Sequence, residues 1–495
     1  MKPAELGWAR GWLNQTKGLY LGGTWQPGNG RVVESRNPAD NQVIGRFTGA
    51  SPDDIDLAVR AARAAFEQGP WSKRSYIKSR GAAMRRIADL IRQHQAELST
   101  LETLDNGKLY SESWGDVEDV ADLFDYYSGW VDKLYGDVNP VASDFLSYTV
   151  HEPVGVVGQI VPWNFPIDMA GYKLTPALAM GNSVVIKPSS TTSFSLIRLV
   201  ELIDEAELLP PGVLNLILGP GSSASHLTRH PDVDKIAFTG STAVGRQLVH
   251  DSADSNLKTV SLELGGKSPN IVFADAVDLD QAIARSWQLT FTGKGEKCSE
   301  PTRLLVERPV YDRVLQGLAE HYANWRVGDP FSEWSNQGPQ VSEEHFNSIM
   351  SYIRIGLEEG ARLLVGGDRN LEPGNENGFY LNPTVFVDCT NDMRIAQEEI
   401  FGPVLTVIPF DGEEEAIRIA NDSPYGLAAG FWTSDIARSQ RVANALQAGQ
   451  VFINRYGCYD HASPFGGWKE SGWGQDLARA SLSLYTKPKA IWYAH

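Results

Sequence analysis

Cysteine is scarce in this sequence of 495 residues, which holds only three, Cys298, Cys389 and Cys458. An odd number of cysteines at such wide spacing does not build a disulfide framework and is typical of a reducing compartment. Long apolar runs are lacking too, and the first residues show no apolar core of a signal peptide. We therefore expect a cytoplasmic protein without a membrane span.

Positive charge is also in deficit. Lys and Arg number 44 against 61 Asp and Glu, which leaves a formal net charge of −17. This excess of negative charge argues against nucleic acid or an anionic membrane as a partner. Apolar residues make up 42% of the chain and charged residues 21%, as in folded globular proteins. The length exceeds one ordinary core, so two or three domains are expected.

From residue 155 onward, short apolar runs alternate with helical patterns. This alternation predicts a doubly wound parallel sheet whose strands are buried on both faces. The predicted strands are residues 154–161, 183–186, 213–218, 235–238 and 259–264. Polar residues follow these strands, at the edge where such sheets bind ligands. They are Asn164, Lys187, Thr239, Ser241 and Glu263.

A second α/β stretch is predicted from about residue 265. Its expected strands are residues 303–307, 363–365, 404–408, 429–432 and 451–453, with helices at 311–325 and 346–359. Alternation over residues 145–152 predicts a strand of a hairpin that reaches away from the main core. The apolar end strand at 489–493 would be exposed on a monomer, which indicates pairing with another subunit.

Cys298 is the candidate nucleophile, because it lies on a glycine-rich loop just before the predicted strand at 303–307. A lone cysteine is more often a small buried hydrophobe. Two other residues change that balance. Glu263, beside two glycines, is a candidate base, and Asn164 offers an amide donor in an apolar turn. A nucleophile, a base and an amide donor are the parts that covalent chemistry on a carbonyl group requires.

Two segments compete as the phosphate site. Residues 219–224 match the Gly-x-Gly-x-x-Ala fingerprint, but a proline in the turn and no suitably placed acidic residue favour a plain turn. Residues 238–245 are the better site, because they lead from a strand into a helix N-terminus. No metal site is expected, since His226 and His230 lack a third ligand nearby.

Seven motifs occur in the order found in one family. They are PWNFP at 162–166, KPSS at 187–190, FTGS at 238–241, LELGGK at 262–267, GEKC at 295–298, EEIFGP at 398–403 and SPFGGWK at 463–469. With them the chain resembles the aldehyde dehydrogenase superfamily over essentially its whole length. The resemblance implies an α/β fold: a doubly wound parallel-sheet cofactor domain (1–128 and 152–262), a second α/β catalytic domain (263–466) and a small β oligomerisation arm (129–151 and 467–495).

The resemblance also implies roles. Cys298 would attack the aldehyde, Asn164 would hold the oxyanion, Glu263 would activate water to hydrolyse the thioester, and Lys173 would assist proton relay. The implied cofactor is NAD or NADP. Its implied binding residues are Ile160, Pro162, Trp163, Lys187, Ser190, Gly240, Ser241, Leu264, Glu399 and Phe401. The implied assembly is a homodimer or homotetramer.

The implied substrate tunnel is mostly apolar, which favours an aliphatic or aromatic aldehyde. Its lining residues are Phe165, Met169, Tyr172, Lys297, Tyr459 and Phe465. Lys297 or Arg455 could instead hold the carboxylate of a semialdehyde. A CoA-acylating enzyme is disfavoured because such members lack the base at Glu263. A non-catalytic structural relative is the remaining alternative.

Three positions depart from the common family pattern. Glu296 stands where many members have Gln, Gly293 replaces a common Asn, and Ser190 stands where NAD-preferring members usually have Glu. A carboxylate at the Ser190 position would clamp both ribose hydroxyls and repel a 2′-phosphate, whereas a hydroxyl can donate to that phosphate. The sequence therefore predicts that NADP is accepted, with preference or alongside NAD.

Overall fold

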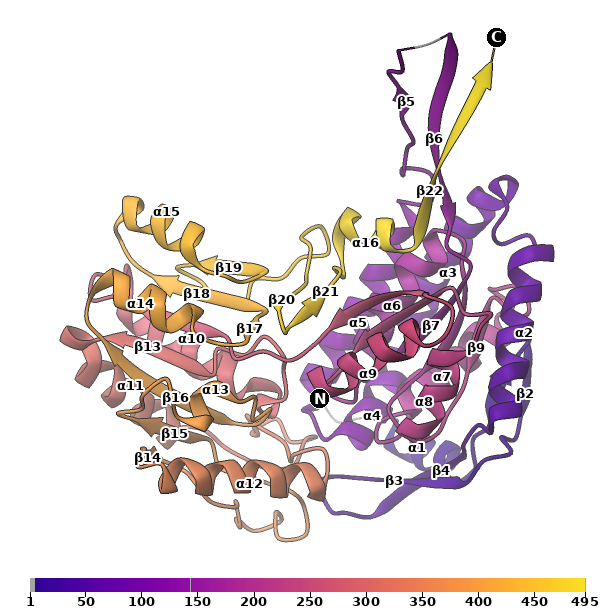
Figure 1. Cartoon of the computed structure of the whole chain (residues 1–495). Coiled ribbons are helices and arrows are strands. Elements are labelled where there is room, and N and C mark those ends of the chain that lie inside the picture. Colours follow the sequence, from indigo (N-terminus) through magenta and orange to yellow (C-terminus); the bar gives the residue numbers. More distant parts are fainter. Residues whose placement is uncertain (1–4, 143, 495) are drawn as a thin grey trace.

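The computed structural model describes residues 5–142 and 144–494. Two α/β parts lie side by side, and a narrow β arm projects from the first of them (Figure 1). This arrangement confirms the predicted α/β class. Across the described residues, every helix is too short or too polar to span a bilayer.

The first part is built on an eight-stranded sheet of order β2-β1-β9-β8-β7-β10-β11-β21. Its central strands are parallel and apolar, as their sequences predict: β7 (Val156–Ile160), β8 (Ser183–Lys187), β9 (Leu214–Leu216), β10 (Lys235–Thr239) and β11 (Thr259–Glu263). Antiparallel strands close both edges: β1 (Leu19–Leu21) and β2 (Thr24–Gln26) on one, β21 (Gly472–Trp473) on the other. A separate hairpin joins β3 (Val32–Arg36) and β4 (Val43–Thr48).

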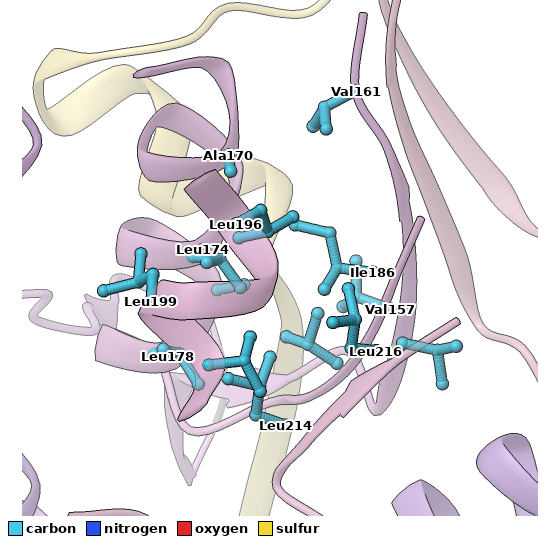
Figure 2. Packing of buried hydrophobic residues seen from close by; sticks show 14 of the residues in the cluster. Val157, Val161, Ala170, Leu174, Leu178, Ile186, Leu196, Leu199, Leu214 and Leu216 are labelled. Atoms are coloured by element: carbon cyan, nitrogen blue, oxygen red, sulfur yellow. The ribbon is translucent and has the colours of Figure 1, made fainter. Parts of the chain in front are cut away.

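Helices cover this sheet. They are α1 (Leu6–Leu13), α2 (Pro52–Gln68), α3 (Ile77–Gln93), α4 (Gln95–Asn106), α5 (Tyr110–Ser128), α6 (Pro166–Ala179), α7 (Phe194–Glu205), α8 (Gly221–Arg229) and α9 (Thr242–Ala253). Helix α2 begins with a reciprocal capping box between Ser51 and Asp54. Figure 2 shows the core, in which Leu174 and Leu178 of α6 face the strand residues Val157 and Ile186.

The second part holds a seven-stranded sheet of order β14-β15-β16-β13-β12-β18-β19. Its strands are β12 (Pro269–Val272), β13 (Arg303–Glu307), β14 (Arg362–Val365), β15 (Thr384–Val387), β16 (Val404–Phe410), β18 (Ala428–Trp432) and β19 (Gln450–Ile453). Its helices are α10 (Leu279–Phe291), α11 (Tyr311–Ala323), α12 (Glu343–Glu358), α13 (Arg394–Gln397), α14 (Gly412–Asn421) and α15 (Ile436–Ala445). Strands β12 and β15 were not predicted.

The arm is a three-stranded antiparallel sheet of β5 (Val138–Asn139), β6 (Phe145–Pro153) and β22 (Thr486–Ala494). β22 pairs with β6 along its whole length, from Thr486 opposite Pro153 to Ala494 opposite Phe145. Of the segment 467–495 expected to belong to the arm, the strand that begins at residue 486 lies in the arm sheet. Before that point, β20 (Trp468–Lys469) pairs with β17 (Tyr425–Gly426), β21 joins the first sheet, and α16 (Ala478–Leu484) packs Leu482 into the first core.

Candidate active site

A cavity of about 360 Å³ lies at the carboxyl edge of the first sheet. From β7 the chain runs to β8 and β9 on one side, while β10 and β11 lie on the other, so the strand order reverses between β7 and β10. Ligands of open parallel sheets bind at such a switch point. The wall consists of Pro162, Trp163, Asn164, Phe165, Asp168, Met169, Tyr172, Thr239, Gly240, Ser241, Glu263, Leu264, Gly265, Lys297, Cys298, Ser299, His345, Glu399, Phe401, Tyr459, Phe465 and Asp476.

The loop that carries Cys298 is shaped by three consecutive left-handed residues. Gly293, Lys294 and Gly295 have φ values of 66°, 65° and 69°. At Gly295 a side chain is excluded, because a Cβ atom there would lie 2.3 Å from the carbonyl carbon of Gly402. The GEKC and EEIFGP motifs therefore meet backbone to backbone, and glycine is required at their contact.

The unusual Glu296 has a buried partner. Its carboxylate lies 2.7 Å from the Lys294 ammonium group, and both side chains are only 1% exposed. The backbone N–H of Val341 donates to the same carboxylate at 3.0 Å. The Glu296 carbonyl oxygen in turn accepts a hydrogen bond of 2.8 Å from the Asn164 side-chain amide. The negative charge of Glu296, at the position where many members of the resembled family have Gln, is thus balanced by Lys294 within the loop. The Asn164 side chain is held against the same loop by its hydrogen bond to the Glu296 carbonyl oxygen.

The thiol of Cys298 and the carboxyl of Glu263 line the same cavity. Glu263 ends β11, where its backbone pairs with Thr239 of β10, and it is 4% exposed. Neither of its carboxyl oxygens has a hydrogen-bond partner among the described residues. Burial, followed by the neighbouring Asp476, raises the pKa of Glu263 well above its ordinary value. Burial, followed by Glu399 and Glu263, raises the pKa of the Cys298 thiol to about 12.

Lys173 lies behind this cavity on α6 and is fully buried. Its ammonium group contacts the Asp476 carboxylate at 2.5 Å. Asp476 itself lines the cavity, and both groups affect the pKa of Glu263. Asp476 escaped prediction because it comes from a distant turn, between β21 and α16.

The cavity wall includes seven of the ten residues expected to bind the cofactor, namely Pro162, Trp163, Gly240, Ser241, Leu264, Glu399 and Phe401. The Ser241 side chain caps the N-terminus of α9 by accepting the N–H of Val244 at 3.4 Å. The Thr239 hydroxyl lines the cavity, is buried and has no partner in the described part of the chain. A helix N-terminus beside an unsatisfied hydroxyl fits a diphosphate.

Glu399 is fixed on the wall of this half. The backbone N–H of Gly266 donates to one of its carboxylate oxygens at 2.9 Å. The other oxygen lies only 2.3 Å from where a Cβ atom of Gly265 would stand. The glycine thus leaves room for a carboxylate that fits a ribose hydroxyl.

The other three expected cofactor residues lie outside this cavity wall. Ile160 and Lys187 are paired neighbours at the carboxyl ends of β7 and β8, and the half-buried Ser190 follows Lys187 by three residues. The Lys187 ammonium group donates to the Pro188 carbonyl at 3.1 Å. Burial lowers the pKa of Lys187 to about 8. These residues therefore lie at the sheet edge next to the cavity, without contributing to its wall.

All six expected tunnel residues line the cavity: Phe165, Met169, Tyr172, Lys297, Tyr459 and Phe465. The Tyr459 hydroxyl donates to the Ser299 hydroxyl at 2.8 Å, next to Cys298. The Lys297 ammonium group is paired with Glu300 at 3.2 Å. Arg455 is exposed and is not part of the wall.

Several wall residues were missed by sequence reasoning, among them Asp168, His345 and Ser299. For Asp168 the sequence held a usable signal. It lies three residues after Phe165 and four before Tyr172, the spacing of one helix face. Residues on one face of α6 line one cavity.

Metal binding finds no support in the residues that the structure describes, where no cluster of three or more His, Cys, Asp or Glu side chains could hold an ion. His226 and His230 instead both approach one oxygen of Asp56, at 2.7 and 3.3 Å. The segment 219–224 forms the turn into α8, with Gly219 at a φ of 133°.

Known proteins resemble this chain closely in sequence and in fold. A model of the aldehyde dehydrogenase family matches residues 25–491. An aldehyde dehydrogenase of Aspergillus niger is 46% identical over 481 residues, which is 97% of this chain and 95% of that protein. A betaine aldehyde dehydrogenase of Bacillus subtilis is 42% identical and covers 97% of both chains. A solved P. syringae indole-3-acetaldehyde dehydrogenase with NAD⁺ has a TM-score of 0.96 at 42% identity, with 100% of both chains covered.

The high thiol pKa predicts that Cys298 is alkylated slowly by iodoacetamide at neutral pH in the cofactor-free protein. Only the thiolate reacts, and a pKa near 12 leaves a very small thiolate fraction, so the rate should keep rising into the alkaline range. Mass spectrometry of the labelled peptides measures this rate. The exposed Cys458 serves as the internal control. A Cys298 rate that reaches its plateau near neutral pH would show that the empty cavity stabilises the thiolate.

Proposed function

Because this chain belongs to the aldehyde dehydrogenase family, we propose that its cavity holds an aldehyde against Cys298 and oxidises it to the carboxylic acid, with NAD or NADP as the hydride acceptor. The observation that carries the proposal is the shared location of three side chains. Cys298, Asn164 and Glu263 come from three separate elements and line one cavity. A non-catalytic relative would have no reason to keep a buried carboxyl without a partner beside a thiol.

In the first half of the reaction, the Cys298 thiol loses its proton to solvent water, and the resulting thiolate attacks the carbonyl carbon to form the oxyanion of a thiohemiacetal. The Asn164 amide has two N–H groups, and one of them is bound to the Glu296 carbonyl oxygen. The second N–H and the backbone N–H of Cys298 hold the oxyanion. The dinucleotide, when bound, accepts the hydride, and the thioester remains on Cys298.

In the second half, Glu263 accepts a proton from water as that water attacks the thioester. A base needs an oxygen that can accept a proton, and neither oxygen of Glu263 has a hydrogen-bond partner in the described part of the chain. Lys173 and Asp476 relay the proton, since their ion pair lies close enough to influence the pKa of Glu263. The carboxylic acid then leaves, and Cys298 is free again.

For the cofactor, we propose that the N-terminus of α9 at Ser241 binds the diphosphate. Lys187 binds the adenosine ribose, with Ser190 beside it, and Glu399 binds the nicotinamide ribose. The remaining contacts come from Ile160, Pro162, Trp163, Gly240, Leu264 and Phe401. In this proposal residues 1–128 and 152–262 form the cofactor-binding domain and residues 263–466 the catalytic domain.

The proposed substrate has an apolar aliphatic or aromatic body, because rings and a methionine make up most of the tunnel wall. The semialdehyde alternative is less well supported. Lys297 is already paired with Glu300, and Arg455 lies outside the wall. Relatives of similar identity are named for indole-3-acetaldehyde and for betaine aldehyde, so their names support no single class.

We propose a homodimer or homotetramer that assembles through the arm, in the cytoplasm. β22 presents exposed aromatic side chains, and the ring of Trp492, which is 58% exposed, stacks edgewise on Phe145 at 6.2 Å. Such a strand is suited to pairing with another subunit. All three cysteines are free, as in a reducing compartment.

Glu263→Gln is expected to keep the first turnover and to lower the steady-state rate by about 10²–10⁴-fold, because hydrolysis loses its general base. Stopped-flow detection of NADH or NADPH should show a burst followed by slow turnover. Cys298→Ala, as the control, should show neither phase. A steady-state rate equal to that of the wild type would assign the base to another group.

Ser190→Glu is expected to shift the ratio of kcat/KM values toward NAD by about tenfold or more, since hydrogen bonds to a charged group contribute about 1.5–3 kcal/mol. The same steady-state assay with each cofactor at a fixed aldehyde concentration measures the shift. Ser189→Glu, one residue earlier, is the matched control. If the wild type proved inactive with NADP, pocket shape rather than this side chain would govern the choice.

Trp492→Asp is expected to increase the fraction of monomer, because it places a charge on the apolar strand proposed to pair with another subunit. Sedimentation velocity over a range of protein concentrations measures the species. Trp334→Asp is the control, since Trp334 is 75% exposed and lies in the second part of the chain. Equal oligomer distributions in the wild type and Trp492→Asp would remove β22 from the interface.

A further inference from the structure

Four carboxyl groups line the cavity, and three of them have a role in the proposed reaction or the proposed cofactor site. Glu263 is the proposed base, Glu399 accepts the Gly266 N–H, and Asp476 is paired with Lys173. The fourth is Asp168, which is 7% exposed and shares a side-chain hydrogen bond with Asp119. Its Oδ1 atom is buried and has no hydrogen-bond partner within residues 5–142 and 144–494. A buried carboxyl oxygen without a hydrogen-bond partner destabilises the folded protein unless a ligand binds to it.

The charged neighbours of Asp168 do not neutralise it. Lys108 is bound to Asp116 at 2.5 Å and lies 3.8 Å from Glu102. His461 is bound to Asp119 at 2.8 Å, and this bond raises the pKa of His461. Each nearby cation thus already has an acidic partner.

Burial, followed by Asp119, raises the pKa of Asp168 well above its ordinary value. An arriving cation would oppose this shift, because an opposite charge nearby favours the ionised form of the carboxyl.

Asp168 lies in the substrate half of the cavity. It is on α6, beside Met169 and on the same helix face as Tyr172. Tyr172 lies near both Asp168 and Tyr459. Its pKa is raised first by burial, then by Asp168, and also by Tyr459. Tyr459 in turn reaches Ser299, next to Cys298. A carboxyl and several aromatic rings thus line the space that leads away from the nucleophile.

Aromatic faces and a carboxylate together form a site for an organic cation. This wall already contains one such contact, because the Lys108 ammonium group lies 4.1 Å from the centroid of the Phe165 ring. A substrate with an anionic end group would find the acid Asp168 here. The Lys297 ammonium group would not offer it a free positive charge, because Lys297 is already paired with Glu300.

We propose that Asp168 binds a cationic end group of the substrate, so that the preferred aldehydes carry a protonated amine or a quaternary ammonium group a few carbons from the carbonyl. This inference rests on the proposed aldehyde oxidation and adds the class of substrate to it. The apolar wall then contacts the carbon chain and the alkyl groups of the cation, while Asp168 selects its charge.

Two aldehydes of nearly equal shape test the proposal, because trimethylammonioacetaldehyde and 3,3-dimethylbutanal differ in having a charged nitrogen or a neutral carbon. In the wild type, kcat/KM is expected to be about tenfold or more higher for the charged aldehyde. Asp168→Asn should reduce this ratio to about twofold or less. Glu118→Gln should leave the ratio unchanged, since Glu118 is an exposed acid on α5 outside the cavity wall.

Each outcome separates the inference from the proposed function. A wild-type ratio near one, or a high ratio that persists in Asp168→Asn, overturns the role of Asp168. Absence of cofactor reduction with both aldehydes and with indole-3-acetaldehyde would instead overturn the proposed function.

A measurement on the wild type covers the case in which Asp168→Asn does not fold. Tetramethylammonium chloride should inhibit 3,3-dimethylbutanal oxidation competitively, whereas sodium chloride at equal ionic strength should not. Equal effects of the two salts would also overturn the proposal.

Discussion

The site depends on one close approach between backbones. Gly266 follows β11 of the first sheet, and a Cβ atom on it would lie 2.3 Å from the carbonyl oxygen of Cys298, which precedes β13 of the second sheet. Gly265 makes the equivalent approach to the Glu399 carboxylate. The two α/β parts share one cavity because the loop after β11 and the loop before β13 meet this tightly. The glycines of LELGGK are therefore the condition for bringing together the proposed base, the proposed nucleophile and the acid proposed to bind ribose.

That tight contact also affects the pKa values of the titratable groups in the cavity. Burial at this contact is the first cause of the raised pKa values of Glu263, Glu399 and Cys298. Asp476 raises the pKa of Glu263 and Lys173 lowers it, so this ion pair influences how readily the proposed base binds a proton.

The parallel strands of the first sheet, most strands of the second, the motifs and the residues at the strand ends could be predicted from the sequence, because apolar runs and glycine patterns are local signals. Asp476 could not be predicted in this way. It enters the cavity from the chain between β21 and α16, and nothing near it in the sequence marks that return. The balance of Glu296 by Lys294 was equally hidden, since it depends on an unusual left-handed lysine. Contacts between distant segments arise from packing, which a local pattern does not describe.

Helix α6 connects the chemistry with the choice of substrate. One side of it, including Ala170, Leu174 and Leu178, is fully buried in the core shown in Figure 2. Another side presents Asp168 to the cavity, while Lys173 reaches Asp476. Because the core residues fix the rotation of the helix, a shift that moved Asp168 would also move Lys173. The proposed group for substrate binding, Asp168, and the proposed group for proton relay, Lys173, therefore keep a constant separation.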